Sequence, residues 1–165
     1  MSLTLFVICA IAAGSLAFVY GITKSKIAKQ AETEKMEAVK FVMPEADRFE
    51  DMGNGKWVAY KDKKKIGFVV EAGIQGYGGP IKIIFGTDIK KTVKKIKIIE
   101  QTETPGLGAK IKEPKFSGQF EGKSAKEIIL KKDNPGEGRI DAISGATISS
   151  RAVTNAIREA LKEIK

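Results

Sequence analysis

Small and hydroxylated residues gather in the stretch Asp141–Ser150, which reads DAISGATISS, directly before a helical pattern begins. A helix start needs one side-chain cap, which Ser144 or Thr147 could supply by accepting a hydrogen bond from a free backbone N–H. One cap leaves Gly145 and Ala146 unexplained. Small residues beside the positive end of a helix leave N–H groups open to an anion, so the second interpretation is a phosphate site. The stretch matches neither the Walker loop nor the dinucleotide-binding glycine fingerprint.

Two glycine-rich loops offer further contacts to a ligand. Residues Ala72–Ile81 read AGIQGYGGPI, where the glycines allow positive φ and a close approach of the backbone, and Tyr77 supplies a planar ring. Residues Glu103–Ile111 read ETPGLGAKI, in which a Pro-Gly turn projects Thr104 and Leu107. Each loop taken alone also fits an ordinary turn or a β-bulge.

Composition excludes several kinds of chemistry. The 165-residue chain has no histidine, which excludes histidine acid–base catalysis, histidine-ligated haem and most zinc sites. Its one cysteine, Cys9, cannot form an internal disulfide or hold an iron–sulfur cluster by itself. Redox chemistry in this chain therefore requires an organic cofactor. The net charge of +9 fits a nucleic acid, an anionic membrane surface or an acidic protein partner.

An uncharged apolar run covers Leu3–Ile22, which is long enough to cross a hydrocarbon core of about 30 Å as a helix. Tyr20 suits the interfacial region, and Lys24, Lys26 and Lys29 follow it. The alternative is a cleaved signal peptide, but no Lys or Arg precedes the run and no convincing cleavage site follows it. By the positive-inside rule, lysines on the C-terminal flank alone favour a cytoplasmic domain. The anchor argues against a nucleic-acid partner, and so does the lack of interleaved aromatic and basic residues in the chain.

Hydrophobic periodicity predicts the elements that position the three loops. A helical stalk is expected over Thr23–Arg48, with Pro44 ending or breaking it. Four strands are expected next, at Lys56–Tyr60, Ile66–Val70, Ile81–Asp88 and Thr92–Gln101. The first two read as a hairpin around a polar turn. The register of the last strand stays open, because Val93, Ile96 and Ile98 need not share one face.

The last segment predicts a helix that presents an apolar stripe. The stripe consists of Val153, Ala156, Ile157, Ala160, Leu161 and Ile164. A shorter run, residues 124–133, fits either a short helix or a strand. Strands with flanking helices and no regular βαβ alternation indicate an α+β fold. We therefore predict one N-terminal transmembrane helix (1–23), a helical stalk or linker (24–50) and a small antiparallel-sheet domain flanked by helices (51–165).

The order GYGG, ETPGLG, DAISGATISSRAV resembles the FMN-binding domain of the Rnf and Na⁺-NQR respiratory complexes. It is most like the G subunit of Rnf (RnfG), and next NqrC of Na⁺-NQR. The resemblance runs from about Gly67 to the C-terminus, and the single N-terminal anchor also fits. The family motif D-x-x-[ST]-G-A-T is filled by Asp141, Ser144, Gly145, Ala146 and Thr147. Residues 51–165 are thereby identified as an FMN-binding domain.

The resemblance implies a role for each motif residue. Thr147 would be joined through its oxygen to the 5′-phosphate of FMN by a flavin transferase. Asp141 would serve recognition by that transferase, by helping to place a metal ion and the incoming flavin phosphate. The residues that would cradle the phosphate through backbone groups are Ser144, Gly145 and Ala146. The residues near the isoalloxazine ring would be Tyr77, Thr104 and Leu107. No catalytic residue and no metal ligand is implied in the chain itself.

The resemblance also implies a function, an electron-transfer subunit of a membrane-bound ion-translocating ferredoxin:NAD⁺ oxidoreductase that is not catalytic alone. Its partners would be the iron–sulfur and flavin subunits A, B, C, D and E of Rnf. Its FMN domain would lie on the extracytoplasmic side of the cell (inner) membrane, contrary to the lysine flank. Two alternatives remain. One is an NqrC-type subunit of a Na⁺-translocating NADH:quinone reductase, and the other is a non-enzymatic anchored module that binds an anion or a partner.

Overall fold

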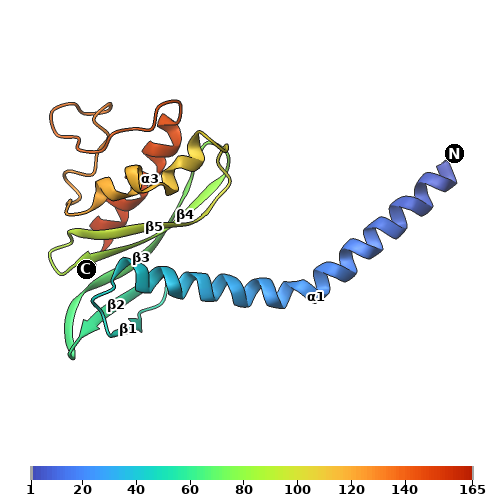
Figure 1. The fold of residues 1–165 in the computed structure, drawn as a ribbon, viewed down its shortest axis with the longest axis horizontal. Coiled ribbons are helices and arrows are strands. Elements are labelled where there is room, and N and C mark those ends of the chain that lie inside the picture. The colour runs from blue at the N-terminus through green and yellow to red at the C-terminus, as the bar shows by residue number, and fades with distance from the viewer. Residues whose placement is uncertain (1, 165) are drawn as a thin grey trace. The chain divides into compact units, whose positions relative to one another are not determined.

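The computed structural model describes residues 2–164 (Figure 1). The chain divides into two compact units, one through Met36 and one from Glu37 onward. The first unit consists of the greater part of helix α1 (Ser2–Val42), which is long and apolar enough to cross a membrane. The helix ends just before Met43-Pro44, because the residue before a proline is disfavoured in the helical region.

The second unit is built on a five-stranded antiparallel sheet whose strands follow chain order. The strands are β1 (Arg48–Asp51), β2 (Lys56–Lys61), β3 (Lys64–Gln75), β4 (Pro80–Asp88) and β5 (Val93–Gln101). The predicted α+β class, the antiparallel sheet and the hairpin are confirmed. The first strand was missed. The stalk helix ends at Val42 rather than at Arg48, which confirms the expectation that Pro44 ends it. Only Phe49 of β1 is even half-buried, so this strand carries no apolar alternation.

A bulge fixes the register of the last strand. Thr87 pairs with Val93, whereas the preceding Gly86 pairs with Lys95, so one extra residue, Lys94, enters β5. The bulge reverses the alternation after it. As a result, Val93, Ile96 and Ile98 all reach the same buried core despite their uneven spacing.

The two faces of the sheet bury different partners. One face, which includes Val70 and Phe85, packs with helix α3 (Thr147–Glu163; Figure 1). The predicted apolar stripe at the end of the chain lies in that core. The other face, which includes Trp57 and Ile84, buries the last turn of α1 and Met43. Because both of its faces are covered, the sheet is a rigid base for the loops at its edges.

Short helical pieces connect β5 to α3, namely η1 (Gly108–Lys112), α2 (Pro114–Ser117) and η2 (Gly118–Phe120). The segment 124–133, expected as a short helix or a strand, is neither. It forms turns and one isolated bridge between Leu130 and Ile140. The Glu127 carboxylate accepts hydrogen bonds from the Ser124 backbone N–H and hydroxyl, and such local bonds compete with regular structure.

Candidate functional site

The three loops singled out in the sequence meet around one pocket of about 510 Å³, a size in the range of small-molecule sites. Its lining residues are Tyr77, Glu103, Thr104, Leu107, Gly108, Lys132, Gly145, Ala146, Thr147, Ile148 and Ser149. The first comes from the β3–β4 turn and the next four from the segment that follows β5. Lys132 comes from the loop before the motif, and the last five come from the turn into α3 and its first residues. The fold thus unites segments that lie up to 72 positions apart in the chain, from Tyr77 to Ser149.

Helix α3 begins at this pocket without a side-chain cap. Its N-cap is Ala146, and neither Ser144 nor Thr147 caps it, so the capping interpretation of the motif was wrong. Gly145 has φ +76°, a left-handed conformation that favours glycine and turns the chain into the helix. The first backbone N–H groups of the helix have no intrahelical partner and lie at its positive end. Such an N-terminus suits a phosphate group.

Thr147 is the first residue of α3, and its side chain is half-buried at the pocket. Its hydroxyl makes no hydrogen bond to any of residues 2–164. By contrast, the hydroxyl of Ser150, three residues later, donates to the Ala146 carbonyl at 2.9 Å and accepts from the Ile143 N–H at 3.0 Å. The Thr147 hydroxyl is therefore the one that is left available for chemistry in this first turn.

Glu103 lies at the base of the pocket and was not recognised from the sequence. Its side chain is buried, with 5% of the residue exposed. One carboxylate oxygen accepts hydrogen bonds from the backbone N–H groups of Tyr77 and Gly78, and the other accepts one from the Ser149 hydroxyl. The only sequence signal was an acid directly before the Thr-Pro-Gly turn, and nothing in the local pattern indicates its burial.

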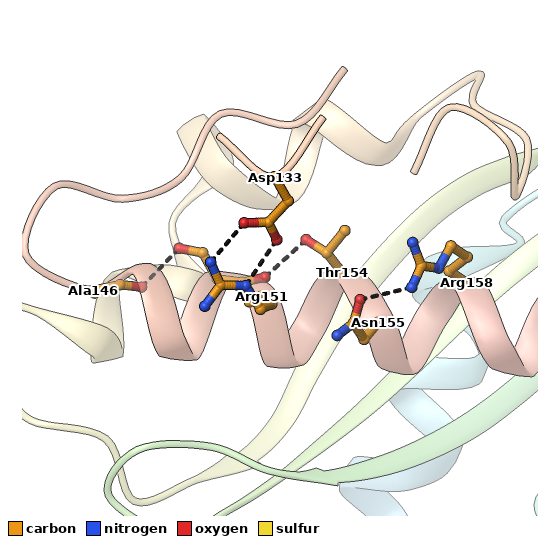
Figure 2. A network of polar contacts seen from close by, with 7 residues as sticks. Asp133, Ala146, Arg151, Thr154, Asn155 and Arg158 are labelled. Carbon is orange, nitrogen blue, oxygen red and sulfur yellow. Dashed lines mark hydrogen bonds and ion pairs between the residues drawn. The ribbon is translucent and has the colours of Figure 1, made fainter. Parts of the chain in front are cut away.

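Among residues 2–164, Lys132 is the one basic residue that lines this pocket, and it was not predicted from the sequence. The loop that carries it is held to α3 by its neighbour. Asp133 accepts hydrogen bonds of 2.8 and 2.6 Å from the guanidinium of Arg151 (Figure 2). This bond with Arg151 holds the pKa of the Asp133 carboxyl below its ordinary value. A planar two-point ion pair fixes orientation as well as distance, so the loop carrying Lys132 has a defined place beside Thr147.

The beginning of the motif faces a different pocket. Asp141 and Ser144 line a neighbouring pocket of about 530 Å³, together with Lys110, Lys115 and Gln119 among others. The Asp141 carboxylate pairs with Lys131 at 2.8 Å, and its backbone N–H donates to the Gln119 side chain. The structure brings six of the eight predicted site residues to the first pocket. It leaves Asp141 and Ser144 at the second.

The first pocket has the chemistry of a site for a flat ligand that carries a phosphate. Tyr77 and Leu107 are exposed at its rim and offer a planar and an apolar wall. The uncapped helix N-terminus and Lys132 provide favourable positions for negative charge. These residues fit FMN, whose ring system is flat and whose phosphate is anionic.

Comparison with known proteins agrees with this site. The model of the FMN-binding domain family matches residues 76–162, and that of the RnfG N-terminal region matches residues 1–42. Two relatives cover nearly the whole chain. The G subunit of a proton-translocating ferredoxin:NAD⁺ oxidoreductase complex from Clostridium ljungdahlii is 34% identical over 97% of this chain and 88% of its own length. The G subunit of an ion-translocating oxidoreductase complex from Methanosarcina acetivorans is 36% identical over 96% and 89%.

Two solved structures share the fold of part of the chain. The crystal structure of the C subunit of the Na⁺-translocating NADH-quinone reductase from Parabacteroides distasonis is 30% identical, with a TM-score of 0.54 over 64% of this chain and 58% of that one. That of Shewanella oneidensis NqrC is 20% identical, also with a TM-score of 0.54, over 73% and 67%. The second likeness concerns the fold alone.

Proposed function

The chain belongs to the family of FMN-binding G subunits of ion-translocating oxidoreductase complexes, and on this premise we propose that it carries electrons on FMN within such a complex. The observation that carries the proposal is the convergence of the GYGG, ETPGLG and SGAT segments on one pocket at the start of α3. When bound, FMN supplies a carrier of one or two electrons. The chain itself is a redox subunit and not a catalyst alone.

We further propose that the FMN phosphate is attached to Thr147 through a phosphoester. Thr147 lines the pocket, and its hydroxyl has no hydrogen-bond partner among the described residues. It lies at the uncapped end of a helix, where a phosphodiester charge is stabilised by the helix dipole and by free N–H groups. The ester replaces the hydroxyl hydrogen and one phosphate hydroxyl, so one water equivalent is lost. Lys132 would balance the remaining negative charge.

The other predicted residues have roles around this attachment point. Gly145 and Ala146 would approach the phosphate through their backbone, and Tyr77, Thr104 and Leu107 would contact the ring. These five residues line the same pocket as Thr147. Since Ser144 shares the second pocket with Asp141, we assign both to the surface that a flavin transferase reads.

The proposed place of the chain is beside the redox subunits of a ferredoxin:NAD⁺ oxidoreductase complex, anchored in the membrane through α1. Electron transfer to and from a flavin needs no acid–base side chain, which suits a chain without histidine. We place the FMN-binding domain on the extracytoplasmic side. A covalent tether prevents loss of the cofactor where no pool of free flavin replenishes it, and partner subunits can orient a helix that has a weak charge bias.

An NqrC-type role in a quinone reductase is the second candidate, and the fold shared with the quinone-reductase protein of Parabacteroides distasonis favours it. Two observations favour the G-subunit role instead. The RnfG N-terminal region matches residues 1–42, which contain the anchor, and the two G-subunit relatives extend over almost the full chain.

The test is in-gel flavin fluorescence of the full-length protein co-expressed with a flavin transferase. We expect a fluorescent band for the wild type and for Thr147→Ser, and none for Thr147→Ala. Thr33→Ala is a matched control, because Thr33 is exposed in α1 and bonds only the Lys29 carbonyl of its own helix. A dark wild-type band in the presence of the transferase would contradict covalent attachment. Fluorescence that persists in Thr147→Ala would move the attachment to another residue.

A further inference from the structure

We propose that Glu103 is a positioning residue that assembles the flavin pocket by joining its three loops. The inference rests on the proposed FMN site, because it concerns how the ring walls are held relative to Thr147. Glu103 does not itself need to contact the ring or the phosphate. Its effect passes through Tyr77, Gly78 and Ser149, to which it is hydrogen bonded.

The two carboxylate oxygens serve different segments. Oε1 accepts from the N–H of Tyr77 at 2.8 Å and from that of Gly78 at 3.2 Å, which belong to the β3–β4 turn. Oε2 accepts from the Ser149 hydroxyl at 2.8 Å, two residues after Thr147 in α3. Glu103 itself follows β5, where its own N–H donates to the Gln101 side chain at 2.6 Å. One side chain therefore joins the turn, the β5 end and the helix.

Two glycines pack closely against the Glu103 side chain. A Cβ at Gly108 would lie 2.7 Å from the Ser149 hydroxyl and 2.9 Å from the Cβ of Glu103, and it would meet Oε2 as well. A Cβ at Gly76 would meet Oε1. Glycine at these two positions lets both loops approach the carboxylate. The sequence pattern of the loops is thus explained by Glu103 as well as by the ligand.

The chemistry of the site favours an acid over other side chains of similar size. Burial of a carboxylate is unfavourable unless hydrogen bonds replace its hydration, and here three donors point at it. Removing the carboxylate would leave two backbone N–H groups without an acceptor at the edge of the pocket. Glutamine keeps the length and one acceptor oxygen for Tyr77 and Gly78, and its amide can donate to the Ser149 hydroxyl.

The first experiment measures flavin loading and flavin mobility in the full-length protein with its transferase. We expect Glu103→Ala to reduce the initial rate of loading about tenfold and to lower the fluorescence anisotropy of whatever flavin is attached. Glu103→Gln should restore both to within about threefold of the wild type, since it keeps the acceptor. Glu121→Ala removes an exposed glutamate outside both pockets and should change neither quantity. Wild-type loading and anisotropy in Glu103→Ala would overturn the proposal.

The second experiment needs no flavin and separates the two proposals. Backbone amide exchange is measured on full-length protein expressed without the transferase. We expect the amides of Tyr77 and Gly78 to exchange about tenfold faster in Glu103→Ala and near the wild-type rate in Glu103→Gln, while core amides of β4 stay unchanged. Unchanged exchange at Tyr77 and Gly78 in Glu103→Ala would refute the role of Glu103. If the two variants change the exchange of Tyr77 and Gly78 as expected but the wild type takes up no flavin, only the proposed function is refuted.

Discussion

Replacing Gly108 with alanine perturbs the base of the pocket without touching Thr147. The backbone of Gly108 is not in the left-handed region, so alanine is not strained by its φ. The difficulty is space, because the new methyl group would lie 2.7 Å from the Ser149 hydroxyl and 2.9 Å from the Cβ of Glu103. Glu103 and Ser149 are both buried, so neither can move into solvent without loss of packing. The hydrogen bond between them should break or lengthen.

The expected loss follows from two effects. Overpacking of a buried site destabilises by roughly 1–3 kcal/mol. A lost hydrogen bond to a charged group adds about 1.5–3 kcal/mol. The lower ends together give about 2.5 kcal/mol of unfolding free energy for Gly108→Ala. For a domain of this size, about 4 °C per kcal/mol is typical, so the Tm should fall by about 10 °C.

The assay is thermal and urea unfolding of the full-length protein in detergent, together with flavin loading. Gly118→Ala is the matched control, because Gly118 has helical φ and ψ and a Cβ there would meet nothing within 4 Å. The control should be as stable as the wild type or slightly more so. If Gly108→Ala unfolds at the same temperature as Gly118→Ala and loads flavin equally well, the close packing around Glu103 is not as described.

Two further predictions concern other parts of the domain. Because Arg151 lowers the pKa of Asp133, the carboxyl should titrate by NMR below its usual value near 4, and Arg151→Gln should raise that midpoint. The stability that this pair contributes should be present at neutral pH and disappear as the pH falls through the lowered pKa of Asp133, so the two proteins should converge in stability only at acid pH. On β3, Gly67→Ala should lower the unfolding free energy by about 1–3 kcal/mol, since its Cβ would meet the backbone carbonyl of Thr87. Gly73→Ala on the same strand, with open space, should cause no loss in urea unfolding, and equal losses at both positions would contradict this reasoning.

The elements that could be predicted from the sequence are those with a strong local pattern. The anchor is a continuous apolar run, and the hairpin of β2 and β3 and helix α3 each carry an apolar pattern that matches their structure. The strand β1 could not be predicted, because most of it is exposed and it is held by pairing with β2. The turns of residues 124–133 could not be predicted either, since they are held by local hydrogen bonds within the backbone and between side chain and backbone, which leave no periodic pattern.

The candidate site likewise contains residues that the sequence predicts and residues that only the fold reveals. Thr147 and the loop residues Tyr77, Thr104 and Leu107 stand in recognisable motifs, and the fold gathers them at one pocket. Glu103 and Lys132 carry no such signal, because what makes them part of the pocket is contact between segments that are distant in the chain. The separation of Asp141 from Thr147 into two pockets depends on the turn at Gly145 and likewise follows only from the fold.

The most direct measurement of the central claim is the position of the flavin within the chain. Tryptic digestion of the flavin-loaded protein should release Ile140–Arg151, a peptide that contains Ser144, Thr147, Ser149 and Ser150. Tandem mass spectrometry should find this peptide heavier by the mass of FMN less one water, with the added mass on Thr147. An unmodified peptide from flavin-loaded protein, or the added mass on one of the three serines, would contradict the account.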